Sequence, residues 1–98
     1  MASVSFFAQL IGTDLQPGAS HNWEAWGFGG NSAVAVTAIP SRQEGGGTIS
    51  RMLAVENVRV ESRSGVISGP SLKVFCSVRN VGYNSVPSYA LNFFAFSP

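Results

Sequence analysis

The sequence predicts an all-β protein, and three observations support this class. Apolar and polar residues alternate in most segments, with the two-residue period of a β-strand. Good helix formers are few, whereas Gly, Ser and Val recur throughout the chain. Segments rich in turn-forming residues interrupt the alternation about every ten residues. Since 98 residues leave room for one domain, we expect a single antiparallel, immunoglobulin-like β-sandwich of about seven strands over residues 1–98, with a small closed β-barrel as the alternative.

The first half of the chain contributes three expected strands, at residues 3–10, 20–28 and 33–39. The turn between the first two contains Pro17-Gly18, a dipeptide typical of turns. Gly29-Gly30-Asn31 ends the second strand and turns the chain into the third. Pro40 ends the third strand, because proline has no N–H to donate to a sheet.

Two more strands are expected at residues 48–55 and 58–63, between surface loops at 41–47 and 64–70. The alternation changes parity between them. Leu53 and Val55 share one parity, whereas Val58 and Val60 share the other. One extra residue at Glu56-Asn57 would cause this change, so we expect a β-bulge or a switch between sheets at that point.

The last two expected strands, residues 72–79 and 88–96, alternate strongly and flank a loop of turn-forming residues. This arrangement predicts a long β-hairpin. If the aliphatic sides of both strands face inward, antiparallel pairing places Val78 opposite Tyr89 and Val74 opposite Phe93. The inward face then carries Leu72, Val74, Cys76 and Val78 together with Tyr89, Leu91, Phe93 and Ala95.

The other face of this hairpin would carry Phe75, Phe94 and Phe96. Three adjacent phenyl rings would form an apolar patch of a few hundred Å², roughly the size of an interaction surface. We therefore predict that these three residues contact another copy of the chain. The alternative is that a loop or the N-terminal segment around Phe6 and Phe7 covers them.

Residues 58–62 and 71–82, the latter reading Ser-Leu-Lys-Val-Phe-Cys-Ser-Val-Arg-Asn-Val-Gly, are followed by Tyr-Ala-Leu-Asn-Phe-Phe from residue 89. This pattern resembles the CARDB (cell-adhesion-related) β-sandwich of bacterial surface proteins, in which a strand ends in a Val-x-Asn-x-Gly turn before the last strand. The resemblance covers about half of the chain. It implies a β-sandwich fold and a non-catalytic role.

The composition narrows the class of partner. Charged residues make up 11% of the chain, well below the roughly 25% of an average soluble domain. A surface of such low charge suits a protein that contacts copies of itself, a neutral ligand or a larger assembly. The net charge is +1 and the basic residues are scattered, so nucleic acid is not an expected partner.

The chain offers little for catalysis or metal binding. It contains one His, one Asp, one Cys and four Glu, which are spread along the sequence. Zinc and calcium sites need clusters of ligands, and Cys76 falls on an inward face, where a nucleophile would be inaccessible. We therefore expect no enzyme activity, no catalytic residues, no metal and no cofactor.

The binding candidate is the expected strand at residues 20–28. Alternation places His21 and Trp23 on one face, and Asn22, Glu24 and Trp26 on the other. We expect Trp23 to lie in the core and Trp26 to be exposed. An exposed indole beside amide and carboxylate groups can stack on a sugar ring and bind its hydroxyls, or can anchor a protein partner.

A second binding candidate is the loop between the last two strands, where Asn80, Tyr83 and Asn84 are expected to be displayed. We predict a non-catalytic binding or adhesion module that recognises a carbohydrate or a protein surface and acts as a homo-oligomer. The alternative is a structural, self-assembling subunit of a fibre, shell or capsid-like array, without a small ligand.

The first ten residues lack the pattern of a secretory signal, and no segment has transmembrane length. The composition is compatible with a secreted or surface-associated protein, and the compartment stays open.

Overall fold

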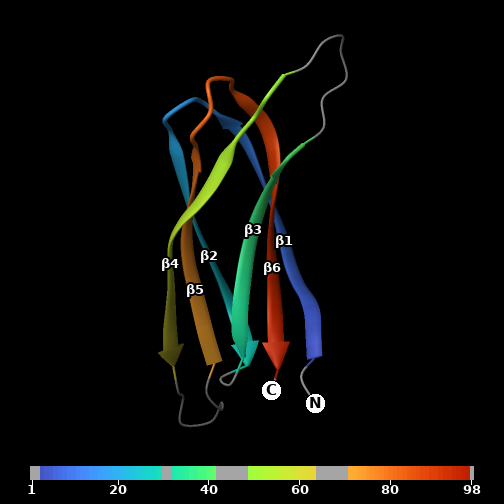
Figure 1. Cartoon of the computed structure of the whole chain (residues 1–98). Helices are drawn as coiled ribbons and strands as arrows, with labels where there is room; N and C mark the ends of the chain where they lie inside the picture. Colours follow the sequence, from blue (N-terminus) through green and yellow to red (C-terminus); the bar gives the residue numbers. More distant parts are fainter. Residues whose placement is uncertain (1–2, 30–31, 42–48, 64–70, 98) are drawn as a thin grey trace.

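The computed structural model describes residues 3–29, 32–41, 49–63 and 71–97, which form six strands and no helix (Figure 1). The strands are β1 (Ser3–Leu15), β2 (Ser20–Gly29), β3 (Ala33–Pro40), β4 (Leu53–Arg63), β5 (Ser71–Asn80) and β6 (Val86–Ser97). Sheet A has the order β1-β6-β3, and sheet B has the order β2-β5-β4. Every pairing is antiparallel, and neither sheet closes on itself among the described residues. The predicted all-β sandwich is therefore confirmed.

Along the sequence, the chain passes back and forth between the two sheets. Only β4 and β5 are consecutive strands within one sheet, and every other connection crosses between sheets. β6 ends where β1 begins, with Ser3 opposite Ser97, so both chain ends lie at the same end of the molecule (Figure 1). The part of the chain that the structure describes contains no apolar helix long enough to cross a membrane.

The parity change near residue 57 is a β-bulge, as the alternation predicted. The register of β4 against β5 shifts between Glu56 and Arg59, and Asn57 has a left-handed φ of 53°. The two strands expected on either side of the bulge are therefore one strand, β4, which begins only at Leu53. A second bulge interrupts β2 at Gly27, whose φ is 99°.

The predicted hairpin of the last two strands is wrong. β5 is the central strand of sheet B, and β6 is the central strand of sheet A, so the two do not pair. Residues 81–85 carry the chain from one sheet to the other, across the roughly 10 Å that separates two packed sheets. The physical reason is that alternation shows which side of each strand is buried but does not show how the two strands are arranged. They can pair by hydrogen bonds within one sheet, or they can lie in opposite sheets with their apolar sides in contact.

The inward faces of these two strands are nevertheless as predicted. The side chains of Val74, Val78, Leu91 and Phe93 are completely buried. Burying one such side chain stabilises the fold by about 1.5–3 kcal/mol. The two central strands therefore supply most of the core, which comprises Leu15, Phe28, Leu72, Val74, Cys76, Val78, Val86, Tyr89, Leu91, Phe93 and Ala95.

The predicted patch of three phenyl rings does not form. Phe75 lies on the outer face of sheet B, whereas Phe94 and Phe96 lie on the outer face of sheet A. The separation follows from the assignment of β5 and β6 to different sheets. Phe96 is 37% exposed, while Phe75 and Phe94 are half-buried. Any interface between copies can therefore use Phe75, or Phe94 with Phe96, but not all three in one surface.

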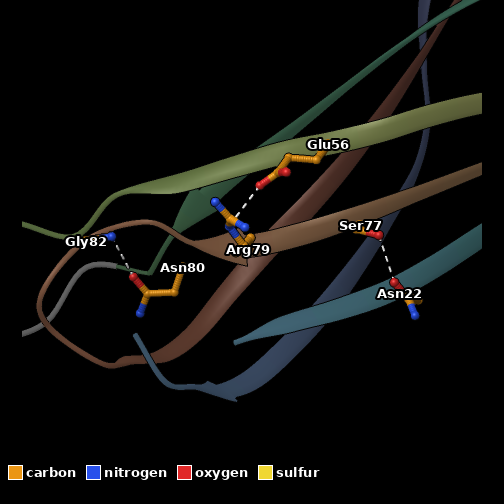
Figure 2. Close-up of polar contacts among 6 residues, drawn as sticks. All are labelled: Asn22, Glu56, Ser77, Arg79, Asn80 and Gly82. Carbon is orange, nitrogen blue, oxygen red and sulfur yellow. Dashed lines mark hydrogen bonds and ion pairs between the residues drawn. The ribbon is translucent and has the colours of Figure 1, made fainter. Parts of the chain in front are cut away.

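Asn80, expected at a displayed loop tip, is instead completely buried. Its amide nitrogen donates to the carbonyl oxygens of Leu15 (3.0 Å) and Asn84 (2.8 Å), and its side-chain oxygen accepts from the N–H of Gly82 (3.0 Å; Figure 2). Its backbone N–H donates to the carbonyl of Ala19 at 3.1 Å. Asn80 therefore joins the β1–β2 turn to the β5–β6 connection, and these contacts hold one end of the sandwich together.

Candidate functional site

The outer face of sheet B carries the binding residues predicted on β2. Asn22, Glu24 and Trp26 point outward, and Trp26 is 64% exposed. His21 and Trp23 have the opposite parity and are half-buried toward the core. The predicted division, with Trp23 inside and Trp26 outside, is confirmed.

Lys73 of β5 lies among the aromatic residues of this face. Its ammonium nitrogen is 3.4 Å from a carboxylate oxygen of Glu24. The same nitrogen is 5.1 Å from the ring centroid of Trp26 and 5.2 Å from that of Phe75. These distances are within the range of cation–π attraction, so Lys73 holds the two rings and the carboxylate in one cluster.

A shallow, open depression of about 600 Å³ lies beside this cluster. The guanidinium carbon of Arg59 is 5.5 Å from the ring centroid of Phe75, and the Arg59 Nε donates to the carbonyl of Asn57 at 3.3 Å. The bulge at Asn57 therefore brings the Arg59 side chain over the central strand. The depression is lined by Asn22, Trp23, Glu24, Asn57, Arg59, Phe75, Cys76 and Ser77.

Two cross-strand polar contacts lie further along this face (Figure 2). The Ser77 hydroxyl donates to the side-chain oxygen of Asn22 at 2.7 Å, which leaves the Asn22 amide nitrogen available to donate to a ligand. Arg79 and Glu56 form an ion pair at 3.1 Å. Both partners of that pair are largely exposed, so it contributes at most about 1 kcal/mol to stability.

Tyr83 and Asn84 lie at the opposite end of sheet B from Trp26. Trp26 pairs with Lys73, and the β5–β6 connection begins seven residues further along β5, after Asn80. That is roughly 23 Å at the rise of a β-strand. Tyr83 is 99% exposed, whereas the Asn84 side chain donates to the carbonyl of Ser50 at 2.9 Å. The structure therefore does not bring the two predicted binding regions together.

His21 faces the interior and takes part in a partly buried hydrogen-bond cluster. Its Nδ1 is 2.7 Å from the hydroxyl of Tyr89, and the Trp23 Nε1–H donates to the same hydroxyl at 2.8 Å. The Tyr89 ring lies directly against the backbone of Gly12, where an added Cβ would be 2.2 Å from the ring. This cluster links β2 of sheet B to β6 of sheet A through side-chain hydrogen bonds.

The thiol of Cys76 is also buried in the core. Cys76 is 1% exposed, and burial raises the pKa of its thiol, which disfavours the reactive thiolate. Among the described residues, no three His, Cys, Asp or Glu side chains are grouped so that they could hold a metal ion.

No protein-family model, curated protein or solved structure matches the chain. The function is therefore argued from the outer face of sheet B. Sequence reasoning identified Asn22, Glu24 and Trp26, but it did not identify their neighbours Lys73 and Arg59. The missing information was the order β2-β5-β4, which alternation does not encode.

Proposed function

We propose that this protein is a non-catalytic binding module that recognises a neutral carbohydrate on the outer face of sheet B. The observation that carries the proposal is the exposure of Trp26, which presents an indole on a strand rather than on a loop. An indole face can stack on the apolar face of a sugar ring. Asn22 and Glu24 point to the same side and supply a hydrogen-bond donor and acceptors for hydroxyl groups.

The charges of this face favour a neutral ligand. Lys73 is paired with Glu24, and Arg79 is paired with Glu56, so positive and negative groups alternate over short distances. Such a face has no extended field of one sign that would attract an ionic ligand. The depression has a volume within the usual range for small-ligand sites, although it is open. We therefore expect weak binding to each copy, which association of copies would strengthen.

The test is a glycan array followed by NMR titration of the saccharides that bind. Trp26→Ala should weaken binding at least tenfold, because it removes the stacking surface. Tyr83→Ala is the matched control, since it removes an exposed aromatic ring from the opposite end of the sheet, and it should bind like the unmodified protein. Equal binding by the Trp26→Ala variant, or no saccharide bound at all, would contradict the proposal.

A structural, self-assembling subunit is the second candidate, and the outer face of sheet A favours it. From Gln9 to Thr13 on β1 and along β3 and β6, the described side chains on this face are uncharged: Gln9, Ile11, Thr13, Ala33, Ala35, Thr37, Ile39, Ser88, Ala90, Asn92, Phe94 and Phe96. Phe94 and Phe96 are the part of the predicted self-association surface that this face retains. Such a face suits contact with copies of the chain. Open-ended polymers in light scattering would support this candidate, whereas a closed dimer supports the binding module.

A further inference from the structure

The four edge strands of the sandwich differ in how well they are protected against pairing with a strand of another chain. β1 and β2 are each interrupted by a register shift, as is β4, where Asn57 has left-handed backbone geometry. Bulges of this kind block pairing of a sheet edge with another strand. β3 pairs with β6 in unbroken register from Ala33 to Pro40 and contains no charged residue. It is therefore the one edge in the described part of the chain that lacks these protections.

The backbone groups that β3 presents to its free edge can be identified. The N–H of Ser41 donates to the carbonyl of Ser88 at 3.0 Å, so odd-numbered residues of this strand direct their backbone groups toward β6. Val34, Val36 and Ala38 therefore direct their N–H and C=O groups away from β6. Pro40 shares this parity, and its missing N–H costs no hydrogen bond within sheet A. In the described residues no strand pairs with this edge.

Two valines on the inner side of β4 are also exposed on the same side of the molecule. β3 lies opposite β4, just as β1 lies opposite β2. Val60 pairs with the buried Val74, yet it is 54% exposed, and Val58 next to the bulge is 47% exposed. On the β1–β2 side, by contrast, the rings of His21 and Tyr89 stack between the two sheets, with their centroids 5.8 Å apart.

We propose that two copies of this chain associate through β3, in an antiparallel pair with its two-fold axis at Val36. In this register Val34 faces Ala38 of the second copy, and Ala35 faces Thr37 of the second copy. Val34, Val36 and Ala38 of each copy would each donate one backbone hydrogen bond and accept one. The second copy is the favoured occupant because the register is self-complementary, opposes no like charges and extends an apolar inner face beside Val58 and Val60.

This arrangement is closed. Once β3 is paired, every remaining edge carries a bulge, so growth stops at two copies. An antiparallel pair within one continuous sheet has its two-fold axis perpendicular to that sheet. Both copies of sheet B therefore lie on the same side, and both Trp26 faces point in the same direction. The proposal does not depend on the identity of any ligand.

The first test is the molar mass in solution by light scattering and sedimentation. The unmodified protein should have twice the monomer mass of 10.3 kDa. Ala38→Pro removes one outward N–H and leaves the hydrogen bonds to β6 intact, so it should give a monomer with unchanged circular dichroism. Ile11→Ser is the matched control: it alters the outer face of sheet A, far from the β3 edge, and should remain a dimer. A monomeric unmodified protein, or a dimer that Ile11→Ser disrupts and Ala38→Pro does not, would overturn the proposal.

The second test checks the register without requiring a monomeric variant. Residues 35 and 37 of the two copies would be direct neighbours on the outer face, where two thiols can form a disulfide. A mixture of Ala35→Cys and Thr37→Cys proteins should form a covalent heterodimer under mild oxidation. Each protein alone should crosslink at least tenfold less, and buried Cys76 should not react. Equal crosslinking of either variant alone would show a different register and overturn the proposal.

Discussion

Asn80 is the residue that most clearly connects sequence to fold, because its side-chain amide bonds three backbone groups, one at the end of β1 and two in the 81–85 connection. Its place in a Val-x-Asn-x-Gly stretch suggested a turn, and the turn is present. The sequence could not reveal that the side chain points inward, since Asn serves equally well as an exposed turn residue. The burial arises because the end of β1 and the 81–85 connection both contact the Asn80 side chain.

Asn80→Ala should lower the free energy of unfolding by about 2–4 kcal/mol, because it removes the partner of the buried Leu15 carbonyl and of the partly buried Gly82 N–H. Urea denaturation followed by tryptophan fluorescence measures this loss. Asn84→Ala is the matched control, since its amide makes one exposed hydrogen bond, and it should cost less than about 1 kcal/mol. Equal losses in the two variants would contradict the assigned role of Asn80.

Gly12→Ala should destabilise the fold, because the added Cβ would collide with the ring of Tyr89. We expect a loss of about 1–3 kcal/mol, as for other overpacked sites. Gly29→Ala is the control, since its nearest contact would be the Ser32 hydroxyl at 3.4 Å. Thermal unfolding of both variants provides the comparison. A Gly12→Ala protein as stable as the control would show that the Tyr89 ring can move without cost.

Two buried residues on the central strands, Cys76 of β5 and Tyr89 of β6, determine how the stability of the fold responds to high pH. Burial raises the pKa of the Cys76 thiol above its ordinary value of 9.0, and burial is also the main cause that raises the pKa of the Tyr89 hydroxyl above 10.0. Both groups lose protons more easily in the unfolded chain. Their contribution is therefore fully present below pH 9 and is lost as the pH rises through the higher folded-state values.

Denaturation midpoints measured between pH 8 and pH 11 should therefore fall with increasing pH. Cys76→Ala should lower the overall stability but reduce the steepness of this decline, because one of the two titrating groups is gone. A decline of the same steepness in the variant would show that Cys76 does not contribute to the pH dependence.

At the scale of the strand, alternation predicted the buried faces of β2, β5 and β6 and the bulge in β4. Those properties are local, because neighbouring residues in the sequence determine both the two-residue period and its interruption. The assignment of β5 and β6 to different sheets is a non-local property. The same Val and Phe residues can be buried by a strand beside them or by a sheet above them, and only the tertiary arrangement decides between these possibilities.

The bulge in β4 predicts how substitutions at Asn57 change the stability of the fold. Asn57 has a φ of 53°, a region that β-branched residues avoid, so Asn57→Val should cost about 1–2 kcal/mol. Asn57→Gly should be neutral or slightly stabilising, because glycine adopts this geometry without strain. Chemical denaturation of both variants is the measurement. If valine were tolerated as well as glycine, the bulge would not exist in solution.

For the whole molecule, the main feature is the difference between its two outer faces. Sheet B displays charged groups of both signs around Trp26 and Phe75, whereas the outer side chains described on sheet A are uncharged from Gln9 to Thr13 and along β3 and β6. Low overall charge was evident from composition, but its unequal distribution was not. It follows from the sheet assignment, which collects Glu24, Lys73 and Arg59 on one side.

The two chain ends lie side by side, with Ser3 paired to Ser97 at the outermost rung of β1 and β6 (Figure 1). A short peptide could therefore join them, and new ends could be opened at an exposed loop such as the one around Tyr83. The same proximity means that the module can be inserted as a guest into a loop of another protein without forcing the host segments apart.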